Sequence, residues 1–457
     1  MEAIENALKV AADWVWGPPL LILLCGTHLY LTVRLRFIQR YLITAIKISL
    51  RRESEGQGDV SQFGALTTAL AATIGTGNIV GVATAVAAGG PGAVLWMWLT
   101  GVFGIATKYS EALLSVHYRV TNQKGEMAGG PMYVLERGLK QRWLGIVFAA
   151  LTAVAAFGIG CMVQANSIAT LVDETFKISP WISGGLMTVL TAVVILGGIK
   201  WIAKVCEGLV PFMAIFYTVG CAVLLIMHYD TIPATIALIC KSAFTGQAAL
   251  GGFLGAGMRE AIRYGVARGL FSNESGLGSA PIVAAAAQTK NPVRQALVSS
   301  TGTFWDTVVV CLMTGLVVVN SGAWQQGLRG AALTKAAFAD IPLVGPLVLV
   351  VGLLTFVFST ILGWSYYGEK AAEYLFGVRA VLPYRVLWVS AVMAGSVATL
   401  PAVWAFADVA NGLMAVPNLI SLIALSGVLV TLTRQYLWQN NLDASADALP
   451  QADSATK

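Results

Sequence analysis

Eleven apolar runs of about 20 residues are the feature that most constrains the fold of this 457-residue chain. An α-helix rises about 1.5 Å per residue, so about 20 apolar residues cross the hydrocarbon core of a bilayer. Only 11% of the residues are charged, against roughly a quarter in soluble domains. The sequence therefore predicts an all-α polytopic membrane protein with eleven transmembrane helices. The predicted spans are Trp14–Val33, Gly64–Ala87, Gly92–Val116, Gly145–Val172, Ile182–Ile199, Leu209–Met227, a broken span within Met258–Ala287, Ala296–Val319, Leu343–Leu375, Val386–Leu400 and Ala410–Thr433.

Two of these spans are interrupted, and they divide the chain into one helix plus two sets of five. The second span carries Gly75, Gly77 and Asn78, and the seventh carries the glycine-rich stretch Gly269–Gly278. Backbone that leaves a helix inside hydrocarbon must find partners in protein, water or ligand. Each interrupted span opens a set of five, and the two sets enter the membrane from opposite sides. This 5+5 inverted-repeat core predicts a central site between two discontinuous helices; chance clustering among 48 glycines is the alternative.

Five segments follow from this division. Residues 1–56 hold the extra N-terminal transmembrane helix and a cytoplasmic amphipathic helix over Phe37–Leu50. Residues 57–228 form the first five-helix repeat, and residues 229–257 form an extracellular connection that includes a surface helix near Pro233–Ala243. Residues 258–435 form the second repeat. Residues 436–457 have few large apolar side chains, which predicts a disordered cytoplasmic tail.

The distribution of lysine and arginine predicts the orientation in the membrane. Basic residues are concentrated in alternate loops, and the loops between those are poor in them. The positive-inside rule then places the N-terminus outside and the C-terminus in the cytoplasm of a multi-pass cell (inner) membrane protein. Met1–Val10 has no basic region, so a cleaved signal peptide is not expected. The basic-rich loops contain Arg34, Arg36, Arg40, Lys47, Arg119, Lys124, Arg137, Lys200, Lys204, Lys290, Arg294, Arg379 and Arg434.

The first break offers two kinds of backbone group. N–H groups around Thr76, Gly77 and Asn78 begin the outer half-helix, and a helix N-terminus suits a carboxylate. Carbonyl groups just before the break, around Ala71 and Ile74, suit a cation such as Na⁺. Close packing of small residues between helices is the structural alternative.

The second break places Phe271, Ser272 and Asn273 beside a charged pair. Phe271 is predicted to wall a pocket, with Ser272 and Asn273 as polar contacts. A charge at this depth is costly unless it is paired or hydrated. Arg268 and Glu274 are therefore open to two interpretations, a structural ion pair or a part in ion coupling.

The ninth span carries two adjacent hydroxyls, Ser359 and Thr360. Phe356, Thr360 and Trp364 fall on one helical face at steps of four. Two hydroxyls and the carbonyls of the first break would form an oxygen cage for Na⁺, while a hydroxyl bonded to its own helix is the common structural alternative.

Three further polar residues lie within predicted spans. Gln164 has an amide that donates and accepts hydrogen bonds, which suits a zwitterion or a bridge between two helices. Lys108 and Glu111 are spaced to pair on one helix face.

Several function classes lack support in the sequence. There is no Walker loop, HExxH or GxSxG motif, which argues against ATP hydrolysis and protease chemistry. The six cysteines have no CxxC spacing, and no basic face with interleaved aromatics suggests nucleic-acid binding. A channel would need a continuous polar lining, whereas the polar groups here are concentrated at one depth.

Three motifs resemble those of the alanine/glycine:cation symporters. They are the run Gly89–Gly104, the Gly75–Asn78 break before it, and the later run Gly265–Pro281. The resemblance covers the whole membrane portion. Leu95 replaces a usual aromatic and Ser275 a frequent alanine, and neither position is a proposed ligand. The family in turn resembles the five-plus-five amino-acid transporters named after the bacterial leucine transporter.

The resemblance implies a set of ligands. Thr76 and Gly77 would bind the substrate carboxylate, and Asn78 would order the break. Phe271, Ser272 and Asn273 would surround the amine and side chain opposite Gln164, and Trp364 would close over a small side chain. Sodium would be held at Ala71, Ile74, Phe356, Ser359 and Thr360.

The sequence as a whole predicts a sodium-coupled symporter that imports alanine or glycine by alternating access. Na⁺ is the co-transported ion, the amino acid and the lipid bilayer are the partners, and no enzymatic activity is expected. Proton coupling or a larger substrate such as glutamine is the nearer alternative, and an ion channel is a more distant one.

Overall fold

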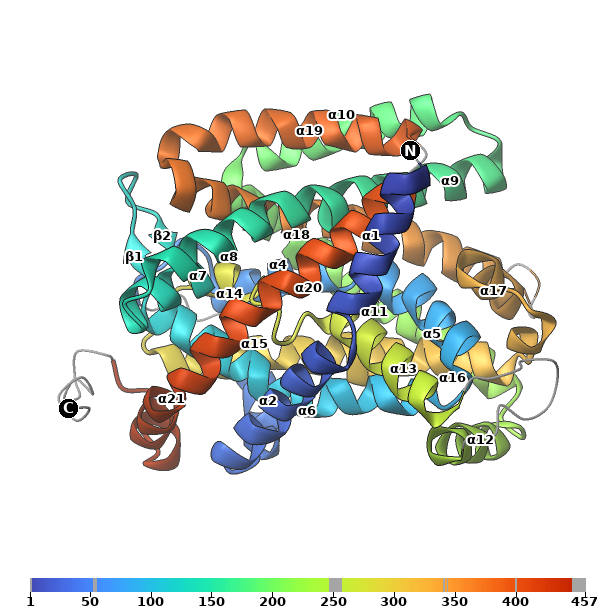
Figure 1. Ribbon diagram of the computed structural model, residues 1–457, viewed down its shortest axis with the longest axis horizontal. Coiled ribbons are helices and arrows are strands. Elements are labelled where there is room, and N and C mark those ends of the chain that lie inside the picture. Colours follow the sequence, from blue (N-terminus) through green and yellow to red (C-terminus); the bar gives the residue numbers. More distant parts are fainter. Residues whose placement is uncertain are drawn as a thin grey trace.

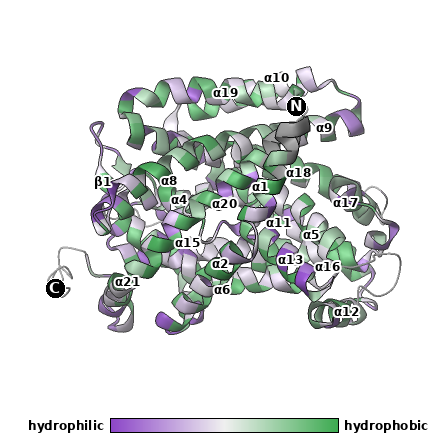
Figure 2. Ribbon diagram, viewed as in Figure 1, coloured by the Kyte–Doolittle hydropathy of each residue, from purple (hydrophilic) through white to green (hydrophobic). Residues whose placement is uncertain are grey.

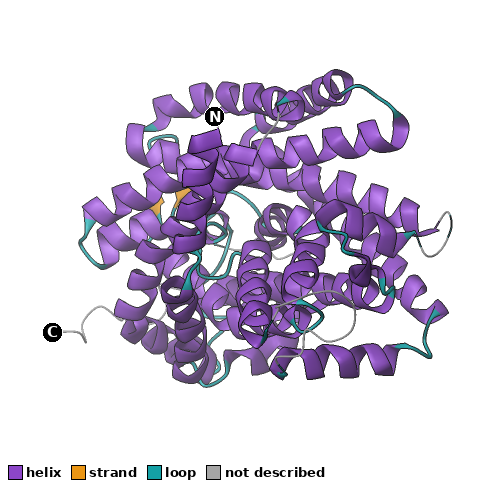
Figure 3. Cartoon of the chain, turned by 45° about the vertical axis from the view of Figure 1, so that its right-hand side comes forward, coloured by secondary structure: helices purple, strands orange, loops and turns teal. Residues whose placement is uncertain are grey.

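The computed structural model describes residues 2–51, 56–245, 257–339, 342, 344–398 and 401–445. Helices form almost all of this part of the chain (Figure 3), and two short strands pair antiparallel in a hairpin, with Val120 opposite Ala128. The predicted helical class is therefore confirmed. The strands are β1 (Val120–Thr121) and β2 (Met127–Ala128).

The N-terminal region forms two helices where the sequence predicted one span. The predicted span Trp14–Val33 is divided near Gly17, and Trp14 belongs to the earlier helix. Pro18 has no N–H and fixes its own φ, which favours the start of a new helix there. The predicted amphipathic segment is helical and turns 65° away from the helix before it. The elements are α1 (Glu2–Val15), α2 (Pro18–Arg34), η1 (Ile38–Tyr41) and α3 (Leu42–Ser49).

The next part of the chain contains the first break. The helix before the break and the helix after it are bent by 51° relative to one another. Several long helices also contain a π-helical turn; the label η marks both these π-helical turns and the short 3-10 helices η1, η6 and η7. The elements are α4 (Gln62–Thr73), η2 (Gly77–Gly81), α5 (Val82–Gly89), α6 (Ala93–His117), α7 (Pro131–Tyr133), η3 (Val134–Gly138), α8 (Arg142–Ala155), η4 (Ala156–Met162), α9 (Val163–Phe176), α10 (Pro180–Ile195) and α11 (Gly198–Met227).

A helix close to the predicted surface segment Pro233–Ala243 leads to the second break and the remaining helices. The predicted disordered tail lies partly outside the described residues, which end at residue 445. The elements are α12 (Ile232–Phe244), α13 (Met258–Asn273), α14 (Pro281–Ala284), α15 (Pro292–Thr303), η5 (Phe304–Cys311), α16 (Leu312–Asn320), η6 (Ala323–Gln326), α17 (Gly330–Phe338), α18 (Val344–Phe376), η7 (Val378–Ala380), α19 (Val381–Val397), α20 (Pro401–Ala424), α21 (Ser426–Thr433) and η8 (Arg434–Trp438).

The described helices support several membrane crossings. Six are long and apolar enough to span a bilayer alone, and two bent pairs meet the same standard together, which gives up to eight spans. Pro180–Ile195 is apolar but has only 16 residues. The count of eleven and the inverted repeat remain predictions.

The two interrupted helices lie at the centre of the packing. α4 packs against α11 and α18, while α13 packs against α5 and α6. α10 lies beside α19 along one edge of the molecule (Figure 1), and apolar residues run along both helices (Figure 2). Ile182, Val193 and Leu387 are among the large apolar side chains exposed there. Such a contiguous apolar surface suits lipid better than water.

A buried charged cluster joins the β1–β2 hairpin to α18. Lys370 Nζ donates to Glu126 Oε2 at 3.0 Å and to Glu373 Oε2 at 2.9 Å, and Asn122 Nδ2 donates to Glu373 Oε1 at 2.7 Å. Lys370 and Glu373 are almost fully buried. Although burial acts in the opposite direction, Lys370 lowers the pKa of Glu126. The cluster fixes the hairpin to the end of α18.

We predict that Lys370→Met destabilises the protein by about 3–5 kcal/mol, because it leaves the Glu373 carboxylate buried and unpaired. Arg142→Gln is the matched control, since the Arg142 side chain is 77% exposed in its pair with Glu136 and such pairs contribute only about 0–1 kcal/mol. Thermal unfolding in detergent measures the stability of both variants. Equal melting temperatures for the two variants would contradict this role for the cluster.

Candidate functional site

The first break begins where α4 ends at Thr73. Ile74 has an extended backbone, and the Gly75 N–H donates to Asn78 Oδ1 at 2.8 Å. This contact replaces a lost helical hydrogen bond with a side-chain acceptor. Asn78 Nδ2 donates to Asp306 Oδ1 at 2.7 Å on the neighbouring helical segment η5. Asn78 therefore closes the turn and ties it to η5.

The second break begins where α13 ends at Asn273. Glu274, Gly276 and Gly278 all have positive φ, a conformation that glycine adopts without strain. The freed N–H groups of Gly276 and Gly278 donate to Glu111 Oε1 of α6 at 3.0 and 3.1 Å. One buried carboxylate from another helix therefore satisfies two backbone donors of the break.

Asn418 of α20 completes this arrangement. Its Nδ2 donates to Glu111 Oε1 at 2.7 Å and to the Gly276 carbonyl at 2.9 Å. The break thus has protein partners for both donors and acceptors, as hydrocarbon surroundings require.

The two breaks meet at Gly77. A Cβ at this position would lie 3.3 Å from Phe271 Cδ1 and 3.3 Å from Ser272 Cα. Ser272 Oγ in turn donates to Asp306 Oδ2 at 3.0 Å. Asp306 therefore accepts hydrogen bonds from side chains of both breaks and holds them together.

The predicted cation ligands converge beside the first break. Ser359 Oγ lies 3.3 Å from the Ala71 carbonyl, and Thr360 Oγ1 lies 3.4 Å from the Ile74 carbonyl. Both hydroxyls also reach the Phe356 carbonyl, at 2.8 and 2.9 Å. The back-bonding alternative therefore occurs as well. Five uncharged oxygens from α4 and α18 gather here, a donor set that suits a hard monovalent cation.

Close backbone contact makes this group of oxygens possible. A Cβ at Gly75 would lie 2.5 Å from Thr360 Oγ1, and one at Gly363 would lie 2.7 Å from Ala72 N. Glycine at both positions therefore lets α18 approach the end of α4 closely.

Gln164 contacts the other side of the first break, and Trp364 of α18 lies against the helical segment η4 that leads to Gln164. Gln164 Nε2 donates to Thr76 Oγ1 at 3.3 Å and to the Ile159 carbonyl at 2.9 Å. Gln164 Oε1 is buried and has no hydrogen-bond partner among the described residues. Trp364 is buried and packs on Gly160, where a Cβ would lie 2.2 Å from Trp364 Cβ. An unpartnered acceptor on Gln164 and the Thr76 hydroxyl thus lie beside the N–H groups of the break.

Asn273 differs from the other predicted substrate ligands. Its Oδ1 accepts from the Ser275 N–H at 2.9 Å, and the residue lines a small cavity with Thr73 and Lys108. Asn273 Nδ2 has no hydrogen-bond partner among the described residues.

Two predicted charge pairs are absent from the described residues. Lys108 forms no ion pair with Glu111, because the Glu111 carboxylate is directed to the backbone of the second break. The structural Arg268–Glu274 pair also does not form. Arg268 lies 5.4 Å from the centre of the Phe271 ring, and Glu274 accepts a hydrogen bond from Ser279. The pairing predicted from sequence spacing for Lys108 and Glu111 is therefore wrong.

The sequence did not predict which residues hold the breaks, namely Asp306, Glu111 and Asn418. An ionisable side chain in an apolar span is itself a signal of function, and Asp306 lies in the predicted span Ala296–Val319. Its partners in the two breaks, Asn78 and Ser272, are more than 30 residues away in the chain, so spacing does not reveal them.

The arrangement defines a class of protein. Two discontinuous helices meet around buried oxygen and N–H groups inside a bundle of apolar helices, which is the architecture of a secondary transporter. The fold is similar to that of MhsT in complex with L-phenylalanine, with a TM-score of 0.54 and 14% identity over 82% of this chain and 98% of that one.

The chain belongs to the sodium:alanine symporter family, whose model matches residues 1–449. It is 51% identical over 442 residues to the sodium/alanine symporter AgcS of Methanococcus maripaludis, which covers 94% of this chain and 97% of that protein. It is 53% identical over 438 residues to an uncharacterized transporter of Haemophilus influenzae, and the match covers 95% of this chain and 96% of that protein. The protein is therefore a multi-pass membrane transporter and not an enzyme.

We predict that Asp306→Ala lowers stability by about 2–5 kcal/mol, because it removes the buried carboxylate that accepts hydrogen bonds from Asn78, Ser272 and Thr307. Asp306→Asn keeps one acceptor oxygen and has the smaller effect. Melting temperatures in detergent measure this difference. If both variants melt like the wild type, Asp306 does not hold the breaks together.

Proposed function

We propose that the protein is a sodium-coupled symporter that imports alanine, glycine or both by alternating access. The observation that carries the proposal is the convergence of the Ala71 and Ile74 carbonyls with the Ser359 and Thr360 hydroxyls. These oxygens lie directly before the N–H groups that begin at Thr76. The cation and the amino-acid carboxylate would thus bind on consecutive parts of one backbone segment.

The shared segment supplies a physical reason for coupling. A cation at Ala71 and Ile74 would fix the end of α4, and this conformation presents the N–H groups of Thr76 and Gly77 to a carboxylate. Each ligand would then raise the affinity of the other by the same factor. Inward movement of Na⁺ contributes about 2.3 kcal/mol per 100 mV, in addition to its concentration gradient.

The substrate class follows from the residues around the break. Phe271, Ser272 and Asn273 would surround the amine and side chain, Gln164 would lie opposite, and Trp364 would limit the side chain to a small size. Asn78 would hold the segment in place. The family membership and the similarity to the sodium/alanine symporter AgcS support sodium and alanine as ligands.

We propose the membrane arrangement that the sequence predicts. The protein would have eleven spans in a one-plus-five-plus-five inverted repeat, in the cell membrane. Its N-terminus would lie outside and its C-terminus in the cytoplasm.

Uptake into proteoliposomes tests the proposal. We predict that an inward sodium gradient drives labelled alanine uptake at equal pH on both sides, and that a pH gradient alone does not. Unlabelled alanine and glycine should compete better than glutamine. Uptake driven by the pH gradient without sodium would refute sodium coupling, and stronger competition by glutamine would refute the proposed substrate.

We predict that Ser359→Ala and Thr360→Ala each raise the sodium concentration for half-maximal uptake about tenfold, equivalent to about 1.4 kcal/mol for one lost ligand. Thr355→Ala is the matched control. Thr355 lies on the same helix, and its hydroxyl bonds to the Val351 and Gly352 carbonyls and not to α4. A sodium dependence shifted equally in all three variants would place the cation elsewhere.

A further inference from the structure

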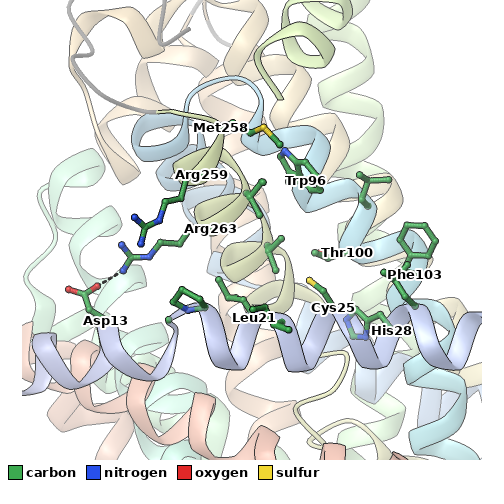
Figure 4. Close-up of a pocket in the computed structure, with 17 residues that line it drawn as sticks. Asp13, Leu21, Cys25, His28, Trp96, Thr100, Phe103, Met258, Arg259 and Arg263 are labelled. Atoms are coloured by element: carbon green, nitrogen blue, oxygen red, sulfur yellow. Dashed lines mark hydrogen bonds and ion pairs between the residues drawn. The ribbon is translucent and has the colours of Figure 1, made fainter. Parts of the chain in front are cut away.

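A large groove lies between α2, α6 and α13 (Figure 4), outside the proposed cation and substrate ligands. Its volume is about 790 Å³, and its walls are mainly apolar. Leu21, Cys25 and Phe103 line it, and Ile22 and Leu29 at its edge are 70% and 50% exposed. In a membrane protein, such exposed apolar side chains face lipid.

The groove runs the depth of about one leaflet. Its inner end is at His28, whose Cε1 is 3.7 Å from the position of a Cβ on Gly276 in the second break. Broken helices in transporters lie near the membrane midplane. From His28 to Pro18 is ten residues, or about 15 Å of helix, which equals about half of the hydrocarbon thickness.

Two arginines lie at the other end of the groove. Figure 4 shows Arg259 and Arg263 side by side on α13, close to Asp13. Arg263 Nη2 pairs with Asp13 Oδ1 at 2.7 Å. Arg259 is exposed, and it forms no hydrogen bond or ion pair with any other residue that the structure describes. One carboxylate against two guanidinium groups leaves a net positive charge at this end.

Aromatic residues place the arginine end at a membrane–water interface. Trp14 is 79% exposed, and the Trp96 indole donates to the Ala243 carbonyl at 3.0 Å on α12. Tryptophan concentrates at the level of the lipid headgroups. The arginines are therefore at the depth of lipid phosphates, and the apolar groove is at the depth of acyl chains.

We propose that this groove binds an anionic phospholipid, with its phosphate group at Arg259 and Arg263 and an acyl chain between α2, α6 and α13. The acyl chain gains little by leaving the bilayer, which is equally apolar. Selection among lipids therefore depends on the headgroup. A guanidinium forms bidentate hydrogen bonds with phosphate, and a negative headgroup balances the net positive charge.

The site would also have a mechanical consequence. α2 lies outside the proposed five-plus-five core, whereas α13 carries the second break. A lipid held by both helices would connect the peripheral helix to the element next to the transport site. Lipid composition would then affect the transport rate without any contact with the substrate.

Native mass spectrometry tests the site. The full chain is purified from membranes that contain both phosphatidylglycerol and phosphatidylethanolamine, and the lipid that stays bound is identified. We expect the wild type to retain phosphatidylglycerol preferentially, and Arg259→Gln to reduce this preference about fivefold, as expected for one basic group near anionic lipid. Arg329→Gln, which removes another exposed arginine, should keep the preference. An unchanged preference in Arg259→Gln would overturn the proposal.

A second variant tests the acyl-chain part of the site. Cys25→Phe fills the groove from α2 and should reduce retention of both lipids, while monodispersity and an unchanged melting temperature in detergent show that the protein is folded. Full retention in Cys25→Phe would show that the lipid binds elsewhere and would overturn the proposal. The lipid measurement does not depend on which amino acid or ion is transported, so it can fail or succeed independently of the proposed function.

Discussion

The structure depends on how two backbone breaks are satisfied inside an apolar bundle. Each freed N–H or C=O would cost several kcal/mol in hydrocarbon without a partner. At the first break Asn78 accepts from Gly75, and Asp306 holds Asn78. At the second break Glu111 accepts from two glycine N–H groups. Side chains from other helices thus supply what the helical ladder lacks, and the packing of α4, α6, α13 and η5 follows from these contacts.

The sequence predicts where the chain breaks, and it does so for a local reason. Glycines and an asparagine within an apolar run identify the first break, and the observed bend is at Ile74–Gly77. The sequence also predicted that the Ser359 and Thr360 hydroxyls lie with the carbonyls of the first break in a Na⁺ cage; the structure brings these oxygens together, and the cage itself stays a prediction. The first break was expected to supply the carbonyls because a cation needs several oxygen donors, and not because of spacing, which carries no information about contacts 286 or 288 residues apart.

What the sequence did not reveal are the partners that close each break. Lys108 and Glu111 are spaced for a salt bridge on an isolated helix, but a buried carboxylate gains more from several well-placed donors than from one neighbour. Asn418 reaches Glu111 across 307 residues, and Asp306 reaches Asn78 across 228. Such contacts exist only after the helices are packed. Similarly, the N-terminal span is divided near Gly17 because a new helix begins at Pro18. Hydropathy alone does not predict this division.

The geometry also explains why cation and substrate would act together under the proposed function. The carbonyl oxygens near Ser359 and Thr360 belong to Ala71 and Ile74, and the N–H groups for a carboxylate begin at Thr76, two residues after Ile74. A turn closed by Asn78 separates the two sets, so a shift of one set would be passed to the other. Because Asp306 ties this turn to Ser272 of the second break, a change at the cation ligands would reach both discontinuous helices. The coupling would therefore reside in the backbone of one short turn, with Asp306 as the group that transmits it.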